Sequence, residues 1–283
     1  MYSLRTYFKS SGYRLMLLPA GIILVFLFVI PIADVVRTSL FDPSFTIGHF
    51  QRFFQTPIYP KVFLRTVYVA LIVTWLCFLV GYPTAYFLAH CRKRTQVYLL
   101  SLILVPFWMS LLIRTYSWIA LLGRQGVINT MLLQAGIISE PLPMLYTSGV
   151  VYVAMVQILV PIMILTCFAV MVEIDQGLVR AARVLGATRW RAFVEVYFPL
   201  SFNGVTTGAI IIFILSMGFF VTPALLGGRQ DLMAGNLIEI QVNQMVNWGF
   251  ASALSVILLA ITIAFVMLFK VSTARFQRGL PQS

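Results

Sequence analysis

Residues 149–172 read GVVYVAMVQILVPIMILTCFAVMV and contain no charged side chain. A helix needs roughly 20 mainly apolar residues to cross the hydrocarbon layer of a membrane, so this stretch is long enough to span one. Five further apolar runs reach or approach that length, at 15–36, 67–89, 97–113, 205–221 and 250–269. The third run, 97–113, is interrupted by Arg114, and it either ends there or bends around Pro106. The sequence therefore predicts an all-α membrane protein with six transmembrane helices.

The composition excludes the other broad classes of protein. Of the 283 residues, 60% are hydrophobic and 10% are charged, whereas a soluble domain has about 25% charged residues. The same excess of apolar residues excludes an intrinsically disordered chain. The three cysteines and two histidines lack the clustered spacing of zinc, haem or disulfide sites, so we expect no metal in this chain.

The net charge of +12 is distributed unevenly between the connecting segments. If the N-terminus is cytoplasmic, the inner segments contain thirteen basic residues: Arg5, Lys9, Arg14, Arg92, Lys93, Arg94, Arg180, Arg183, Arg189, Arg191, Lys270, Arg275 and Arg278. The outer segments then contain only seven: Arg37, Arg52, Lys61, Arg65, Arg114, Arg124 and Arg229. Because positively charged loops stay in the cytoplasm, we predict that both termini are cytoplasmic. The charge then reports orientation and contact with anionic lipid, and we expect no nucleic-acid partner.

Segment 173–201 is much longer than the inner turn after the second span, and its residues predict two short helices. Asp175 is a suitable N-cap for the first helix. One face of that helix repeats small and apolar residues at helical spacing, namely Leu178, Ala181, Ala182 and Leu185. Gly186 interrupts the pattern, and a second helical stretch leads to Pro199. On periodicity alone, the segment is either an amphipathic helix resting on lipid headgroups or a docking element for a cytoplasmic partner.

The same segment contains a motif. Residues 180–199 read RAARVLGATRWRAFVEVYFP and resemble the EAA motif of ABC importer permeases, E-A-A-x3-G-x9-I-x-L-P. Both alanines, the glycine and the proline match in spacing. Val196 and Phe198 are apolar exchanges, whereas Arg180 reverses the charge of the motif's glutamate and permits a different ion pair. The resemblance implies a set of ATPase-coupling residues: Arg180, Ala181, Ala182, Gly186, Ala187 and Pro199.

Further stretches are similar to the first permease subunit of spermidine/putrescine importers, namely 105–108 (VPFW), 112–116 (LIRTY), 226–229 (LGGR), 235–238 (GNLI) and 247–250 (NWGF). This resemblance implies a type I ABC importer permease fold in a bacterial inner membrane. Residues 1–60 would form an N-terminal cytoplasmic segment, the first helix and the start of a periplasmic loop. Residues 61–270 would form the permease domain with its coupling loop at 173–200, and 271–283 a cytoplasmic tail.

The resemblance also implies a function, which is ATP-driven import of a small organic solute such as spermidine or putrescine. Other amines, an opine, an amino-acid derivative or a metal ion are the alternative substrates. The implied partners are a dimer of ATP-binding subunits, a second homologous permease, a periplasmic solute-binding protein and membrane lipid.

The chain itself has no visible energy source. A Walker A loop needs glycine immediately before lysine, and the four lysines follow Phe8, Pro60, Arg92 and Phe269. We therefore expect no enzymatic site and no cofactor in this chain, with ATP and Mg²⁺ bound by the partner ATPase. We also expect no acidic residue inside a span, which argues against the remaining alternative, an autonomous channel or ion-coupled carrier.

The outer segments 39–65, 124–148 and 223–247 are long enough to receive the binding protein, and they include one short amphipathic helix, predicted from Val127, Ile128, Met131, Leu132 and Ala135. Aromatic residues that could contact a cationic amine are Trp108, Tyr116, Trp118 and Trp248. Acceptor groups for the amine could come from Asp231, Asn236, Glu239 and Gln241. The aromatic residues are equally typical of an interfacial belt. Finally, Gly204 and Gly208 predict close helix packing, with a second permease subunit as one candidate partner.

Overall fold

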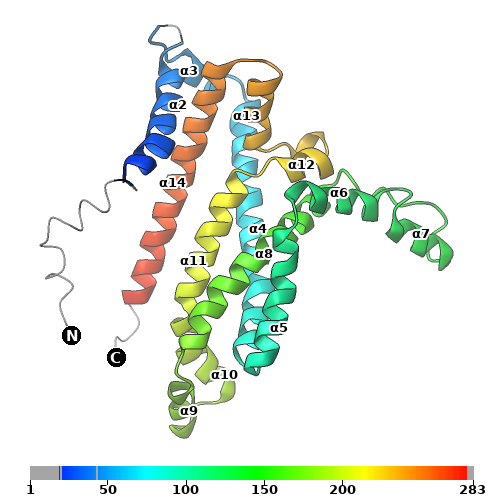
Figure 1. Ribbon diagram of the computed structural model, residues 1–283, viewed down its shortest axis with the longest axis vertical. Coiled ribbons are helices and arrows are strands. Elements are labelled where there is room, and N and C mark those ends of the chain that lie inside the picture. The colour runs from blue at the N-terminus through cyan, green and yellow to red at the C-terminus, as the bar shows by residue number, and fades with distance from the viewer. Residues whose placement is uncertain (1–18, 20, 43, 279–283) are drawn as a thin grey trace, which may run out of the picture. The chain divides into compact units, whose positions relative to one another are not determined.

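The computed structural model describes residues 19, 21–42 and 44–278, which are mostly helical (Figure 1). These residues form no β-strand, and Phe41 and Phe45 make one isolated bridge. By length and composition, five helical segments in the described ranges can cross a membrane, and there are six if one bent pair is counted as a single span. The predicted all-α architecture is thereby confirmed. Arg5, Lys9 and Arg14, which contribute to the predicted orientation, lie outside the described residues, as does the end of the predicted tail 271–283.

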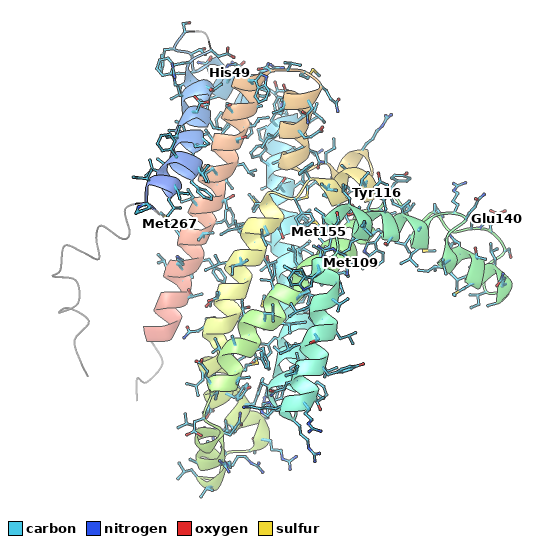
Figure 2. All side chains as sticks on the ribbon, in the orientation of Figure 1. His49, Met109, Tyr116, Glu140, Met155 and Met267 are labelled. Carbon is cyan, nitrogen blue, oxygen red and sulfur yellow. The ribbon has the colours of Figure 1, made fainter. Side chains whose placement is uncertain are left out.

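The chain divides into two compact units, of which the larger contains Pro57–Leu237 and Ala260–Ser283. Its centre consists of α4 (Ile58–Ala89), α8 (Ser148–Glu173) and α11 (Phe198–Met217), which pack against one another. All three helices are apolar around most of their circumference, as expected for helices surrounded by other helices and lipid. Their shared core contains fully buried side chains, among them Val73, Cys77, Met155, Met163, Cys167 and Ile212. Figure 2 labels Met155 within this bundle.

Glycine residues allow these central helices to approach closely. A Cβ atom on Gly204 would lie 2.7 Å from the carbonyl oxygen of Thr166 and 2.8 Å from the Cα of Cys167, both of which are backbone atoms of α8. A Cβ atom on Gly81 of α4 would lie 2.8 Å from the side chain of Met163. The pair Gly204 and Gly208 therefore marks helix packing, and the helix packed against it in the structure is α8 of the same chain.

The third predicted span bends. α5 (Lys93–Leu104) continues into the 3₁₀ turn η3 (Val105–Trp108), which includes Pro106. The chain then turns by 93° before α6 (Leu111–Leu122) and α7 (Val127–Gln134). Of the two sequence alternatives, the bend is the one observed.

The predicted amphipathic helix is confirmed as α7, which lies with α6 in an arm that extends from the bundle (Figure 1). The buried side chain of Asn129 holds this region together. Its Nδ2 donates to the carbonyl oxygens of Gly123 at 2.9 Å and Leu142 at 3.1 Å, and its Oδ1 accepts from the Leu142 N–H at 2.9 Å. Glu140 lies beyond α7 on the same arm (Figure 2).

The fifth span begins well before residue 205, where the apolar run predicts its start. α10 (Arg189–Ala192), the π-helical turn η4 (Phe193–Tyr197) and α11 form one helical segment, Arg189–Met217. Pro199 does not interrupt this segment because it lies in the first turn of α11, directly after the wider π-helical turn. The second helix of the predicted coupling loop is thus continuous with a membrane span.

The smaller unit contains Met1–Thr56 and Ile238–Leu259, and therefore the N-terminal part of α14 (Trp248–Arg278). Its described part is helical from residue 21 and includes the π-helical turn η2 (Val25–Val29), α2 (Ile30–Leu40) and α3 (Gly48–Gln55). His49 Nε2 of α3, labelled in Figure 2, lies 3.4 Å from the Asp42 carboxylate. The Arg52 guanidinium lies 4.6 Å from the centre of the Phe250 ring.

The prediction that no acidic residue lies in a span is wrong for Asp34, Glu173 and Glu195. Asp34 belongs to α2, within the candidate span Gly21–Leu40, Glu173 is the last residue of the candidate span Ser148–Glu173, and Glu195 belongs to the candidate span Arg189–Met217. Glu195 is neutralised by Arg191 one turn earlier, at 2.8 Å. The absence of membrane carboxylates therefore no longer argues against an ion-coupled carrier, and the choice depends on other observations.

Candidate functional site

The predicted coupling loop begins with α9 (Gln176–Val184), whose two ends are fixed by local hydrogen bonds. The predicted N-cap is present, because the Asp175 carboxylate accepts from the Gly177 N–H at 2.7 Å. At the other end, Gly186 N–H donates to the Arg183 carbonyl at 3.1 Å and Ala187 N–H to the Ala182 carbonyl at 3.0 Å. These two bonds form a Schellman motif, in which the C′ residue has positive φ. Gly186 has a φ of +95°, so the predicted bend requires glycine at this position.

An aromatic cluster anchors the second half of the loop to the end of α4. The ring of Tyr86 lies 5.5 Å from Phe193 and 5.1 Å from Tyr197, and the Phe193 and Tyr197 rings are stacked at 5.9 Å. The Tyr82 hydroxyl is hydrogen-bonded to Ser201 Oγ at 2.8 Å. α10 and η4 are therefore fixed to both α4 and α11.

In contrast, the first half of the loop extends beyond the bundle. Figure 1 shows α9 and α10 together at one end of the central helices. Val184 and Leu185 are 87% and 88% exposed, and Trp190 is 74% exposed. Such uncovered apolar side chains mark a surface that contacts something outside the chain. The helical pattern included Trp190 in the second stretch but did not single out Val184, because periodicity shows which residues share a face and not which face is covered.

The exposed surface of the predicted coupling loop is also basic. Arg180, Arg183 and Arg189 are exposed, and none of them forms an ion pair with another described residue. The structure brings five of the six predicted coupling residues together on α9 and its C-terminal end: Arg180, Ala181, Ala182, Gly186 and Ala187. The sixth, Pro199, lies apart from them in the first turn of α11.

A second polar site lies near the other end of α4. Asp231 in η5 (Arg229–Asp231) is only 4% exposed, and its Oδ1 accepts from Arg65 Nη2 at 2.7 Å. Ser148 Oγ donates to the same oxygen, and the Gly228 N–H donates to Oδ2 at 2.9 Å. The network thus connects α4, the start of α8 and η5. Arg65 and Ser148 were missed as partners of Asp231, because a single sequence contains no signal for a pair 166 residues apart.

Three of the four residues predicted as acceptors for the amine are buried, Asp231, Asn236 and Gln241, and the first two have partners in the structure. Asp231 is neutralised by Arg65, as described. Asn236 lies in α13 (Ala234–Asn243), where its Nδ2 donates to the Phe220 carbonyl at 2.8 Å and its Oδ1 accepts from the Met233 N–H at 3.0 Å. In this conformation, neither side chain offers a free acceptor to a cation.

The other predicted pathway residues are divided between the two compact units. Trp108 in η3 is 91% exposed, and Tyr116 on α6 is also exposed (Figure 2), whereas Trp118 packs against the core. Glu239 and Trp248 belong to the smaller unit, where Glu239 accepts from Asn243 at 3.2 Å. Their role in a pathway stays a prediction.

The comparisons with known proteins give the family. Residues 81–280 match the model of the binding-protein-dependent transport system inner membrane component family. This chain belongs to that family. It is an inner-membrane permease of an ABC importer.

Several curated relatives are similar to this permease in sequence, and several solved structures are similar to it in fold. It is 35% identical over 214 residues to the spermidine/putrescine transport system permease protein PotB of Escherichia coli K12, which covers 76% of this chain and 78% of that protein. The PotB protein of Haemophilus influenzae is 36% identical over 211 residues, or 75% and 73% of the two chains. A bacterial ABC transporter that imports the polysaccharide alginate has the same fold, with a TM-score of 0.70, 18% identity, and coverage of 93% and 95% of the two chains. In a second alginate transporter structure, which contains an alginate-bound periplasmic protein, the TM-score is 0.73 and the identity 17%, over 94% of each chain.

For the permease, we expect the Arg65→Ala substitution to be strongly destabilising. Removing the guanidinium leaves the buried Asp231 carboxylate without its countercharge, a loss of about 3–5 kcal/mol in the free energy of unfolding. Denaturant titration in mixed micelles would measure this change. The Arg65→Ala/Asp231→Ala double variant should lose less stability than the sum of the losses of the two single variants.

Arg191→Ala is the matched control, because that arginine and Glu195 form an exposed pair that contributes below about 1 kcal/mol. Equal losses at Arg65 and Arg191 would contradict the buried network.

Proposed function

We propose that this permease carries a polyamine such as spermidine or putrescine across the inner membrane, driven by ATP hydrolysis in a partner subunit. The observation that supports the substrate is the 35% identity to spermidine/putrescine permeases over 76% of the chain. The alginate transporters share the fold at 18% identity or less, and we transfer nothing of their substrate. Opines, amino-acid derivatives and metal ions are the alternative substrates, and they are tested as competitors of a labelled polyamine in an uptake assay.

We further propose that a dimer of ATP-binding subunits docks on α9 and the bend at Gly186. The exposed apolar side chains of Val184 and Leu185 offer a contact area, and the three unpaired arginines favour an acidic surface on the ATPase. Movement of the ATPase would be transmitted efficiently, because α10 continues through η4 into α11 without a flexible connection. ATP and Mg²⁺ would be bound by that partner.

Two partners remain, the solute-binding protein and the second permease, and we assign them to the arm that contains α7 and to the exposed aromatic residues. The segment around α7 would receive a periplasmic solute-binding protein, and a second, homologous permease would complete the pathway. Trp108 and Tyr116 are uncovered in this chain, so they are available either to the amine or to that second subunit. This arrangement places α9 and α10 on the cytoplasmic side, in agreement with the orientation that the basic loops predict.

The test is reconstitution of the complete transporter in liposomes with ATP enclosed. We expect accumulation of labelled putrescine only when ATP and the cognate binding protein are both present. Unlabelled spermidine should compete, whereas opines and amino-acid derivatives should not. Accumulation without ATP would contradict the importer mechanism, and competition by an opine alone would contradict the polyamine substrate while leaving the importer assignment intact.

A further inference from the structure

The largest cavity among those found in the larger unit opens along the first half of α4. Its volume is about 820 Å³, and Tyr152 of α8, residues 229, 230 and 232, and Phe265 of α14 complete its wall. Most of the lining is apolar, including Leu64, Val67, Tyr68 and Leu71. Neither the predicted coupling residues nor the predicted pathway residues line it.

The polar part of this cavity has an excess of positive charge. Lys61, Arg65 and Arg229 all line it, and among the described residues the ion pair that any of them forms is that of Arg65 with Asp231. Lys61 and Arg229 are exposed and have no ion pair within the described part of the chain. Two unpaired cations repel a polyamine and attract an anion.

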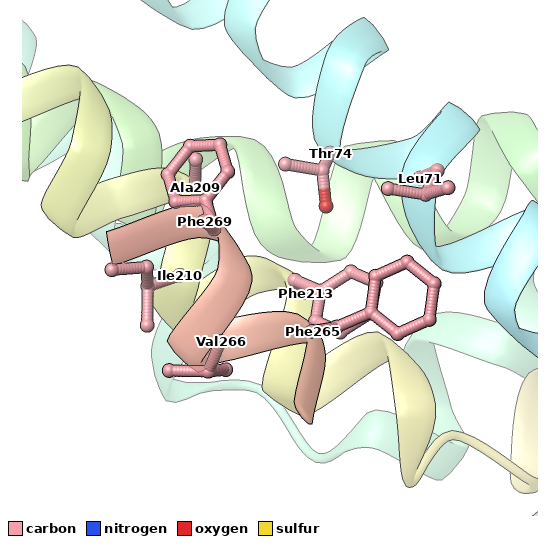
Figure 3. Close-up of a pocket in the computed structure, with 8 residues that line it drawn as sticks. All are labelled: Leu71, Thr74, Ala209, Ile210, Phe213, Phe265, Val266 and Phe269. Atoms are coloured by element: carbon pink, nitrogen blue, oxygen red, sulfur yellow. The ribbon is translucent and has the colours of Figure 1, made fainter. Parts of the chain in front are cut away.

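An apolar crevice continues the cavity along the bundle. A smaller pocket of about 60 Å³ is lined by eight residues of α4, α11 and α14: Leu71, Thr74, Ala209, Ile210, Phe213, Phe265, Val266 and Phe269. Figure 3 shows the phenyl rings of Phe213 and Phe265 beside one another, with Leu71 and Thr74 on the neighbouring α4. Leu71 and Phe265 line both spaces, so one groove runs from the basic residues to the apolar crevice.

The length of this groove matches one leaflet of a membrane. From Lys61 to Thr74 the α4 axis advances about 20 Å, at 1.5 Å per residue. Half of a bilayer, including its headgroups, measures roughly the same. A soluble anion would leave the apolar part empty, whereas a phospholipid places a phosphate at one end and acyl chains along the other.

We propose that this groove is a binding site for one anionic phospholipid, whose phosphate contacts Lys61 and Arg229 and whose acyl chain lies against Leu71, Phe213 and Phe265. The lipid would seal the face between α4 and the C-terminal half of α14. Each basic residue near an anionic headgroup contributes about 1 kcal/mol, or a fivefold change in affinity.

The test is native mass spectrometry of the assembled, delipidated transporter, titrated with phosphatidylglycerol. We expect one retained lipid, bound about 25-fold more weakly by the Lys61→Gln/Arg229→Gln double variant. The matched control is Lys93→Gln/Arg94→Gln, which removes two exposed basic residues outside the groove and should leave retention unchanged. Phe265→Ala should weaken retention of phosphatidylglycerol without changing its preference over phosphatidylcholine.

Three results would overturn the proposal. Equal retention of phosphatidylcholine would remove the role of charge, and equal binding of soluble glycerol phosphate would remove the role of the apolar groove. Retention by the isolated chain but not by the assembled transporter would mean that the second permease occupies the groove. None of these results depends on which solute is transported.

Discussion

Substitution of Gly204 by leucine is expected to prevent α8 and α11 from packing and to abolish recovery of folded protein. Even the Cβ of alanine would lie 2.7 Å from the Thr166 carbonyl oxygen and 2.8 Å from the Cys167 Cα. Both are backbone atoms, which cannot rotate away as a side chain does. Overpacking a helix interface typically costs 1–3 kcal/mol, so Gly204→Ala should destabilise by about that amount and Gly204→Leu by more. Thermal unfolding of the detergent-purified proteins would show whether stability falls in the order wild type, Gly204→Ala, Gly204→Leu.

Two other glycines serve as controls for this prediction. A Cβ on Gly208 would meet the side-chain atoms of Thr166 and Met163, which can move, so Gly208→Ala should be milder than Gly204→Ala. A Cβ on Gly149 in the first turn of α8 would meet nothing within 4 Å. Gly149→Ala should therefore be neutral or stabilising, by up to about 1 kcal/mol from helix propensity. An equal loss of stability at Gly149 and Gly204 would contradict the close helix contact.

The spans could be predicted because apolar length is a local property of the sequence. The run 149–172 corresponds to α8, Ser148–Glu173, almost residue for residue. The fifth span was predicted too short, because Arg191, Glu195 and Asn203 lower the mean hydropathy of the stretch that contains the aromatic residues Phe193 and Tyr197. In the structure these aromatic rings are turned toward α4, and the helix continues through them. Side-chain direction of this kind depends on the packed partner.

The two sites differ in how far the sequence could predict them. The coupling loop was predictable, because the Asp175 cap, the α9 face and the Gly186 bend all depend on residues within one short segment. The network around Asp231 was not, because its partner Arg65 lies on a helix 166 residues earlier. The sequence singled out Asp231 as an acceptor for a cation, and the structure shows a cation of the chain itself bound there. The groove lined by Lys61 and Arg229 has the same non-local origin.

The second large effect is expected for Gly186→Asp, which should leave a folded permease but strongly reduce uptake. A Cβ on Gly186 would meet nothing within 4 Å, so the substitution causes no clash inside the chain. However, a φ of +95° is unfavourable for any residue with a side chain, at a cost of about 1–3 kcal/mol. The aspartate also introduces a negative charge on the surface that we propose docks against an acidic ATPase. Because 1.4 kcal/mol lost from docking already corresponds to a tenfold weaker contact, uptake should fall by about tenfold or more, while the ATPase keeps its basal hydrolysis.

A matched substitution separates the backbone effect from the contact. Gly136 ends α7 in the same Schellman motif, with Gly136 N–H bonded to the Leu133 carbonyl at 3.1 Å and Ile137 N–H to the Leu132 carbonyl at 3.0 Å. Its φ is +68°, and it too has nothing within 4 Å of a Cβ. Thermal unfolding of Gly136→Asp therefore measures how much stability the glycine-to-aspartate exchange costs at a Schellman motif outside the docking surface.

Gly186→Asn keeps the size of aspartate without its charge. If both Gly186 variants lose uptake equally, the bend itself is required. If only the aspartate variant does, the charge of the docking surface is required. Normal uptake by Gly186→Asp at wild-type abundance would remove the bend from the coupling mechanism.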